Sequence, residues 1–243
     1  MIRRVFLDIE TLPPDEDMRR RISPAMIRKL ARQRRADDGT GDCTEEQFRR
    51  LALHGEYGRV LTIALTVEHD DQLIHCGLLG RERQTSLFHL DEGRTLRAFW
   101  KLMRDFKTGK DVVIGHNVLN FDLPFLYKRS YVHGVKPTVE LSFARYRNQP
   151  VFDTMQVWSG WDYRSFLSLS DLGNILGVGS KMEGMNGGCV YDCIAKGDHD
   201  VVARYALQDV ELVRAIYYRM PVPGSFIPNM VPNDDGGEDR DGG

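Results

Sequence analysis

The stretch Val5-Phe6-Leu7-Asp8-Ile9-Glu10-Thr11 joins an apolar run to two carboxylates that are two positions apart. Side chains alternate along a β-strand, so Asp8 and Glu10 share one face and Phe6 precedes them on it. Two like charges at the end of a buried strand repel each other. A divalent cation such as Mg²⁺ or Mn²⁺ removes that cost, because hard cations bind carboxylate oxygens. The alternative is a strand that ends in a polar turn before Pro13-Pro14.

Composition places the chain among ordinary globular proteins. It has 243 residues, enough for one large domain or two small ones, with 42% hydrophobic and 28% charged residues. The net charge of −2 excludes a strong overall basic field, but it leaves room for a local basic patch.

Cysteine usage and hydropathy bear on the cellular compartment. The four cysteines have no CxxC spacing, which is typical of reduced thiols rather than of a disulfide framework or a zinc site. The sequence contains no apolar run of about 18 residues. We therefore expect a cytoplasmic protein without a membrane segment.

The remaining patterns predict alternating strands and helices. Residues 60–67 and 72–79 are rich in β-formers and predict a hairpin that joins the first strand in a meander. Two further strands are predicted at 111–117 and 151–154. Helical periodicity or capping signals predict helices at 95–106, 121–134, 170–176 and 199–220.

Residues 13–58 interrupt this pattern and are interpreted as a helical insertion. The insertion contains a strongly basic run, with Arg19, Arg20, Arg21, Arg28, Lys29, Arg32, Arg34 and Arg35. Two readings of this run stay open, a solvated helix face and a contact with a phosphate backbone. Residues 1–220 are predicted to form a single domain, and the Pro-, Gly- and acid-rich tail at 221–243 is predicted to be disordered.

Two more carboxylates occur where secondary structure could bring them to the first pair. Asp122 begins a predicted helix, where an acid is also favoured by the free amides and the helix dipole. Asp209 lies four residues after Tyr205, so the two side chains are neighbours on one face of the last predicted helix.

These residues occur in three motifs that resemble those of the DEDD 3′–5′ exonucleases. The first is residues 6–11, Phe-Leu-Asp-Ile-Glu-Thr. The second is residues 115–124, with an Asn and a Phe-Asp pair, and the third is residues 205–210 in the YxxxD form. The position five residues before the final Asp is Arg204 instead of His, so the chain is similar to the tyrosine subgroup. It resembles the predicted stand-alone exonucleases related to the proofreading domain of family-B DNA polymerases.

The resemblance implies a fold and a metal centre. The expected fold is ribonuclease-H-like α/β, a mixed five-stranded sheet flanked by helices. Two divalent cations, Mg²⁺ or Mn²⁺, would activate water and compensate charge on the phosphate. On the family's pattern Asp8 would bridge both ions, while Glu10 and Asp209 would hold the ion on the side of the attacking water. Asp122 would hold the other ion, and Tyr205 would orient the water.

Five residues are predicted to bind substrate: Thr11, Leu12, Asn117, Phe121 and Lys181. Asn117 could hold a sugar or phosphate oxygen, or it could cap the end of a strand, and Lys181 could reach a phosphate. Asp153 resembles an acid that follows the second motif in such proteins, although a helix N-cap explains it as well. His116 is interpreted as a packed or surface histidine.

The expected activity is 3′–5′ exonuclease action on single-stranded DNA or 3′ ends, with a role in DNA repair. An exoribonuclease is an alternative, because no motif indicates a contact with the 2′-OH. A nucleic-acid-binding module without catalysis is a second alternative. The presence of all four acids and the tyrosine argues against that module.

Overall fold

The computed structural model describes residues 2–32 and 45–220. The predicted disordered tail at 221–243, part of the insertion, and Arg34 and Arg35 of the basic run lie outside these residues. The side chains of Arg28 and Arg32 also lie outside the description.

The centre of the fold is a five-stranded sheet with the order β3-β2-β1-β4-β5. Strand β2 is antiparallel to both β1 and β3, whereas β4 runs parallel to β1 and β5 parallel to β4. The strands are β1 (Arg3–Leu12), β2 (Arg59–His69), β3 (Gln72–Leu79), β4 (Val112–Gly115) and β5 (Val151–Asp153). The mixed sheet, the hairpin and the meander are as predicted.

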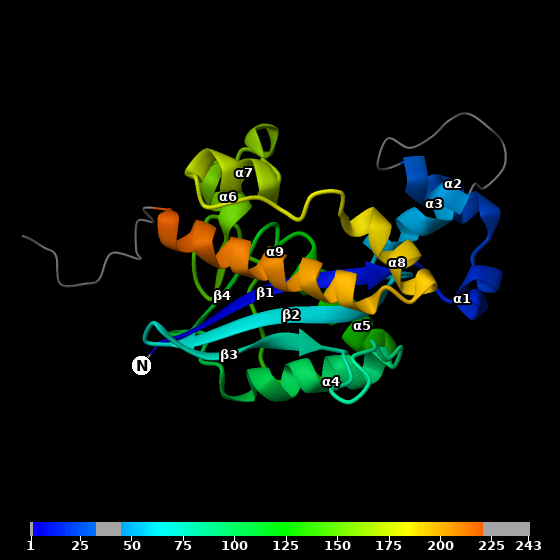
Figure 1. The fold of residues 1–243 in the computed structure, drawn as a ribbon, viewed down its shortest axis with the longest axis horizontal. Helices are drawn as coiled ribbons and strands as arrows, with labels where there is room; N and C mark the ends of the chain where they lie inside the picture. The colour runs from blue at the N-terminus through cyan, green and yellow to red at the C-terminus, as the bar shows by residue number, and fades with distance from the viewer. Residues whose placement is uncertain (1, 33–44, 221–243) are drawn as a thin grey trace, which may run out of the picture.

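Helices cover both faces of the sheet (Figure 1). The long helix α9 (His199–Arg219) packs on one face, and α4 (Glu92–Leu102) and α5 (Asp122–Val132) pack on the other. The alternation of β1 explains the two layers. Phe6 belongs to the core beneath α9, while Val5 and Leu7 belong to the core beneath α4 and α5.

Shorter helices complete the structure. They are α1 (Glu16–Arg21), α2 (Pro24–Arg32), α3 (Glu45–Arg49), α6 (Thr154–Trp158), α7 (Leu169–Leu176) and α8 (Val190–Lys196), with 3₁₀ turns η1 (Arg50–Leu53), η2 (Met103–Asp105), η3 (Tyr163–Ser165) and η4 (Gly187–Cys189). Helix α7 begins after an N-cap at Ser168 and ends at Gly177 in the left-handed region, as its capping signals indicate. Helix α8 was not predicted, because the glycines before it obscure its short periodic pattern.

The described part of the insertion lies beside the C-terminal end of β1 (Figure 1). Arg20 and Arg21 of α1 pair with Asp17 on the same helix, and Arg19 pairs with Glu45 of α3. These exposed pairs are typical of a solvated helix face, so α1 fits the simpler interpretation of the basic run. None of the described helices is both long enough and apolar enough to cross a membrane.

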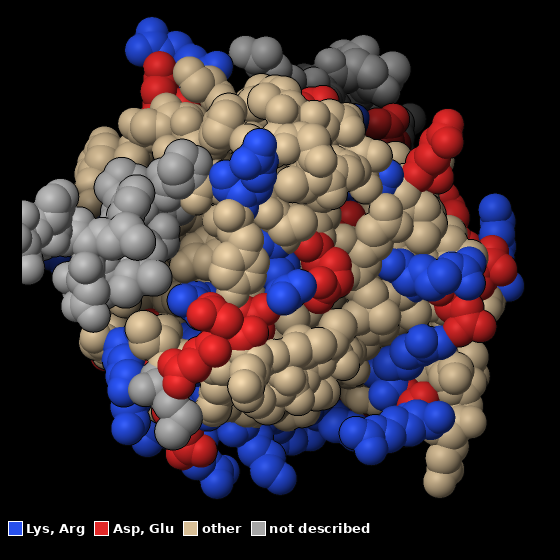
Figure 2. All heavy atoms as spheres, turned by 60° about the vertical axis from the view of Figure 1, so that its left-hand side comes forward, with Lys and Arg blue, Asp and Glu red and all other residues tan. Residues whose placement is uncertain are grey.

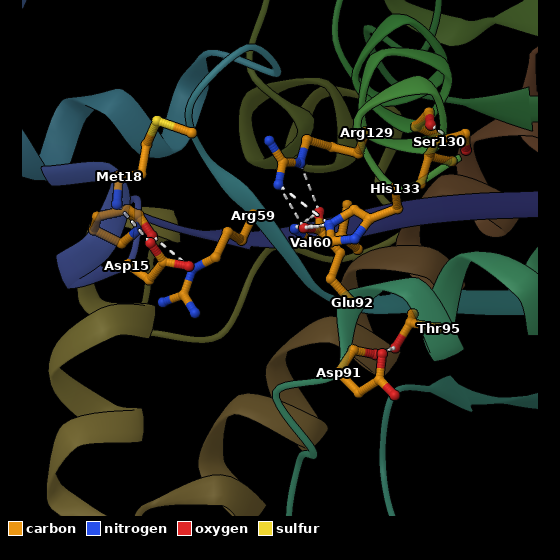
Figure 3. A network of polar contacts seen from close by, with 12 residues as sticks. Asp15, Met18, Arg59, Val60, Asp91, Glu92, Thr95, Arg129, Ser130 and His133 are labelled. Carbon is orange, nitrogen blue, oxygen red and sulfur yellow. Dashed lines mark hydrogen bonds and ion pairs between the residues drawn. The ribbon is translucent and has the colours of Figure 1, made fainter. Parts of the chain in front are cut away.

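A buried polar network fixes α5 to the rest of the fold (Figure 3). Glu92, at the start of α4, accepts two hydrogen bonds from Arg129 of α5, at 2.9 and 2.7 Å. The same carboxylate accepts the backbone N–H of Val60 in β2 at 2.7 Å and lies 2.6 Å from Nε2 of His133. The network therefore joins α4, α5 and β2 at one point, and it holds the helix that begins at Asp122.

Candidate active site

Three carboxylates meet where the C-terminal half of β1 passes under α9. Asp8 and Glu10 extend from the face of β1 that α9 covers, and Asp209 extends from α9. One oxygen from each of the three lies within 4.8 Å of the others. The strand alternation predicted from sequence thus brings the first two acids to the third.

The backbone of β1 changes register just after Glu10. Glu10 pairs with Thr62 of β2, whereas Thr11 pairs with Val60, so one residue of β2 is skipped. Thr11 lines the cavity above the carboxylates. Leu12 is buried in an apolar cluster with Leu61 and is not among the residues that line that cavity, and its contact with substrate stays a prediction.

Asp122 approaches the same strand from the opposite layer. It is the first residue of α5, and its Oδ1 accepts the backbone N–H of Ile9 at 3.1 Å. Burial raises the pKa of both Asp8 and Glu10, and the charge of Asp122 adds to the rise. The side chain is only 3% exposed and does not line the cavity. Asp122 therefore lies on the side of β1 away from the cavity, next to the group of three acids.

The loop that precedes Asp122 is held by Asp153. Its carboxylate accepts the backbone N–H groups of Asn117 and Leu119 at 2.9 and 3.0 Å, and it caps α6 through Met155 and Gln156. Asp153 is therefore an N-cap that also shapes this loop.

Two other polar residues of this loop point away from the cavity. The side chain of Asn117 accepts a hydrogen bond from Asn120 and is not among the residues that line the cavity, and its contact with a sugar or phosphate oxygen stays a prediction. His116 lies 2.9 Å from the Thr154 hydroxyl and 3.0 Å from the Leu167 carbonyl oxygen. Burial lowers the pKa of His116 to about 4, so the imidazole is neutral and packed, as interpreted from the sequence.

Lys181 supplies a positive charge to the acids. Its Nζ lies 2.5 Å from Oδ2 of Asp209 and donates a hydrogen bond to the hydroxyl of Tyr205 at 2.8 Å. The ammonium also lies 4.9 Å from the centre of the Tyr205 ring. The sequence singled out Lys181 as a residue that could reach a phosphate, but it did not predict these two partners.

A glycine in α7 explains how Lys181 reaches the site. A Cβ at Gly173 would lie 2.4 Å from the carbonyl oxygen of Gly179 and 2.9 Å from a Leu212 methyl group. The absence of a side chain at Gly173 lets the connection after α7 pass close to the helix and to α9. The lysine that follows is thereby directed toward Asp209.

A cavity of about 530 Å³ opens above the carboxylates. Phe121 lines it, and so do Tyr205 and Lys181. Its outer wall comes from α3 and η1 of the insertion and from the segment around α8, through Glu46, Arg49, Arg50, Gly187, Gly188 and Tyr191. We did not predict these outer residues, and the only signal for them in the sequence was the nearness of the insertion to the first motif.

Arg49 holds the two sides of the outer wall together. Its guanidinium pairs with Asp192 of α8 at 2.8 Å and lies 5.1 Å from the centre of the Tyr191 ring. Arg50 pairs with Glu46 one turn earlier, in an exposed contact of the kind that contributes little to stability. The Arg50 guanidinium can therefore exchange its partner for an anion in the cavity.

Burial and mutual repulsion make the acids hard to ionise. Burial, together with the charge of Asp209, raises the pKa of Glu10 to about 8. Burial also raises the pKa of Asp122 to about 7, and it raises the pKa of Asp8 well above its ordinary range. The same burial raises the pKa of the Tyr205 hydroxyl far above its ordinary value, so this group is a donor and not a base.

The donor set fits hard divalent cations. Asp209 is 1% exposed, and its Oδ1 has no hydrogen-bond partner among the described residues. A buried carboxylate oxygen without a partner is costly, and a cation that accepts it as a ligand removes the cost. Asp8, Glu10 and Asp209 are thus the residues that could hold a metal ion, with Asp122 next to them.

Comparison with solved structures supports the fold. A family B DNA polymerase from the hyperthermophilic archaeon Pyrobaculum calidifontis is similar, with a TM-score of 0.56 and 18% sequence identity over 90% of this chain. The chain spans 24% of that polymerase chain. At this identity the likeness concerns the fold alone, and it confirms the predicted ribonuclease-H-like α/β architecture. A comparison with curated proteins gave no match.

Comparison with protein families is more specific. Residues 47–225 match the family described as "Predicted 3'-5' exonuclease related to the exonuclease domain of PolB". The match includes Asp122, Tyr205 and Asp209, and the structure adds Asp8 and Glu10 from the strand that precedes it. The chain therefore belongs to the family of predicted 3′–5′ exonucleases related to the exonuclease domain of PolB.

Proposed function

We propose that the chain is a metal-dependent 3′–5′ exonuclease that removes nucleotides from the 3′ end of single-stranded DNA. The observation that carries this proposal is the meeting of Asp8, Glu10 and Asp209 at the base of a cavity, with Asp122 bonded to the same strand. Family membership supports the reaction class. We also propose a role in DNA repair.

The four acids would hold two divalent cations, Mg²⁺ or Mn²⁺. Bound there, the cations would lower the pKa of water and neutralise charge that develops on the phosphate. Four carboxylates balance the four positive charges of two such ions. The raised pKa values of Glu10 and Asp122 imply that ion binding releases protons from the site near neutral pH.

Tyr205 and Lys181 would position reactants instead of moving protons. The Tyr205 hydroxyl keeps its proton at neutral pH, so its contribution is a donated hydrogen bond toward the attacking water or a phosphate oxygen. Lys181 already contacts both Asp209 and Tyr205. The Lys181 side chain is partly exposed to the cavity, so its ammonium would be free to turn toward the substrate phosphate if Asp209 held a cation.

The cavity would bind the terminal nucleotide. Its volume lies within the range of ordinary small-molecule sites, roughly 300–1,000 Å³. Phe121 offers an apolar ring for stacking a base, and Thr11 lies beside the carboxylates. We further infer that residues 1–220 form one exonuclease domain and that the insertion at about 13–58 forms the outer wall of its site.

The test is a gel ladder from 5′-labelled DNA and RNA oligonucleotides of one sequence, incubated with Mg²⁺ or Mn²⁺. We expect progressive shortening of the DNA from its 3′ end and no reaction by an Asp8→Ala variant prepared in parallel. Shortening of RNA alone would replace the proposed substrate with RNA. Binding without shortening of either polymer would overturn the enzymatic proposal in favour of a binding module.

A further inference from the structure

A second cavity, lined by basic residues, lies on the α4 side of the sheet. It has a volume of about 380 Å³, and Arg97, Lys101, Arg104 and Lys136 contribute to its walls. None of the described residues that line it is acidic. We call this cavity the basic groove. The catalytic cavity is lined by other residues and opens beneath α9, so the two cavities are separate.

The basic groove comes from two segments that are distant in sequence. Arg97 and Lys101 lie one turn apart on α4 and Arg104 follows in η2, so the three recur along one side. Lys136 comes from the connection after α5. Figure 2 shows Lys and Arg side chains gathered along its lower edge, which is the side of the molecule where α4 lies in Figure 1.

The cations of the groove are not neutralised by the protein. No ion pair joins Lys101, Arg104 or Lys136 to an acid among residues 2–32 and 45–220. Arg97 has only a long contact of 4.0 Å with Asp91. Arginines elsewhere on the described surface, such as Arg4 and Arg81, have carboxylate partners. In a chain of net charge −2, the groove brings together three cations, Lys101, Arg104 and Lys136, that have no carboxylate partner among the described residues.

Local helix electrostatics explain only part of the pattern. The helix dipole favours cations near the C-terminal end of α4, which accounts for Lys101 and Arg104. It does not account for Lys136, which belongs to another segment. Like charges at spacings of three and four residues also repel each other, so the arrangement costs stability unless an anion is bound.

The base of the groove is rigid. Trp100 is 1% exposed and donates its indole N–H to the Ser130 hydroxyl at 2.8 Å. Thr138 donates its hydroxyl to the backbone carbonyl of Trp100 at 2.6 Å, which fixes the connection that carries Lys136 against α4. The charges therefore project from a fixed surface, as a site for an extended anion requires.

We propose that the basic groove binds the phosphodiester backbone of a nucleic acid at a site distinct from the catalytic cavity. The choice of nucleic acid as the polyanion rests on the proposed exonuclease function. A strand held at both places would stay bound between successive cleavages. Because the contacts are to phosphates, binding would be independent of base sequence and weakened by salt.

The test compares two variants with equal loss of charge. One carries Lys101→Gln, Arg104→Gln and Lys136→Gln in the groove, and the control carries Arg83→Gln, Arg164→Gln and Lys196→Gln at exposed positions elsewhere. Fluorescence anisotropy measures the affinity of each for a labelled 30-nucleotide single strand over a range of NaCl concentrations. An Asp8→Asn change in every chain prevents digestion during the measurement.

We expect the groove variant to bind the long strand at least about tenfold more weakly than the control variant. The slope of log affinity against log salt should become shallower by about 2, since each lost phosphate contact removes about 0.7 from the slope. With Asp8 restored, hydrolysis of a trinucleotide should be unchanged, because so short a strand occupies only the catalytic cavity.

Equal affinities and equal slopes for the two variants would overturn the groove proposal and leave the exonuclease proposal intact. Absence of hydrolysis by the unmodified chain would overturn the exonuclease proposal alone, because the binding comparison does not depend on catalysis. Circular dichroism melting of both variants checks that the comparison is between folded proteins.

Discussion

Two groups of buried carboxylates lie in the two layers of this sheet, and they differ in how well the protein satisfies them. On the α4 side, Glu92 is 4% exposed and is bonded to Arg129, His133 and a backbone N–H (Figure 3). On the α9 side, Asp209 is 1% exposed, Lys181 pairs with one of its oxygens, the other has no partner among the described residues, and Asp8 and Glu10 lie close to it. The carboxylate on the α4 side has hydrogen-bond partners and stabilises the fold, whereas the acids on the α9 side include an oxygen without a partner in the described part of the chain.

This difference in hydrogen bonding indicates that the acids on the α9 side lower the stability of the fold in exchange for the capacity to bind cations. A buried carboxylate that is fully bonded needs nothing more, whereas a group of acids with one lysine between them retains capacity for cations. The site therefore resembles a structural ion-pair network in which the acids outnumber the cation, Lys181, that pairs with them.

The largest expected effect is loss of activity when Asp8 is changed to Asn. Because metal assistance contributes several kcal/mol and each 1.4 kcal/mol is tenfold, the rate of nucleotide release should fall on the order of 10³-fold. In EDTA the same change should raise the melting temperature, because it removes repulsion among the acids. Release rates with Mn²⁺ and melting curves in EDTA measure the two effects, and a variant that is both active and less stable would contradict the account.

The second effect is loss of stability when Glu92 is changed to Gln. Breaking a buried ion pair costs roughly 3–5 kcal/mol, which corresponds to a drop of roughly 10 °C in melting temperature for a chain of this size. The matched control is Glu56→Gln, which removes an exposed pair with Lys128 and should cost less than about 1 kcal/mol. Thermal unfolding of both variants measures these costs. Equal drops in melting temperature would show that the buried network stabilises the fold no more than an exposed ion pair does.

A smaller effect is expected when Tyr205 is changed to Phe. The hydroxyl keeps its proton and supplies one hydrogen bond, so its removal should lower kcat about tenfold with little change in KM. Steady-state kinetics with a labelled single strand measure this. A loss as large as that of the Asp8→Asn variant under the same metal concentration would show that Tyr205 does more than position reactants.

The last effect is a pH dependence of stability in EDTA. The raised pKa of about 8 for Glu10 means that the folded chain keeps a proton that the unfolded chain releases near pH 4.5. The corresponding stabilisation is fully present below about pH 4.5 and is lost as the pH rises to about 8. Melting temperatures should therefore decline across this window, and Glu10→Gln should flatten the decline. If the melting temperature of the Glu10→Gln variant depended on pH as that of the unmodified chain does, the raised pKa of Glu10 would be contradicted.

Strand and helix patterns predicted the parts of the molecule that are locally encoded. The alternation around Asp8 and Glu10, the hairpin, and the spacing of Tyr205 and Asp209 each depend on residues close in sequence, and the structure places them as expected. The family match covers the second and third motifs.

Features that depend on distant contacts could not be predicted. Lys181 reaches Asp209 only because a glycine in α7 admits the intervening loop, and no periodic pattern records that approach. The pairing of Glu92 with Arg129 joins residues 37 positions apart. The positions of Leu12 and Asn117 also depend on such contacts, because a register shift in β1 precedes Leu12 and Asn120 donates a hydrogen bond to the side chain of Asn117.

The central claim is that the incomplete group of acids is a site for two divalent cations. The most direct measurement is the number of Mn²⁺ ions bound per chain, determined by electron paramagnetic resonance in the presence of a deoxynucleoside monophosphate, the expected product. We predict two ions for the unmodified chain and the loss of at least one with Asp8→Asn, while Glu92→Gln retains both. Absence of Mn²⁺ binding, or a stoichiometry that Asp8→Asn leaves unchanged, would contradict the claim.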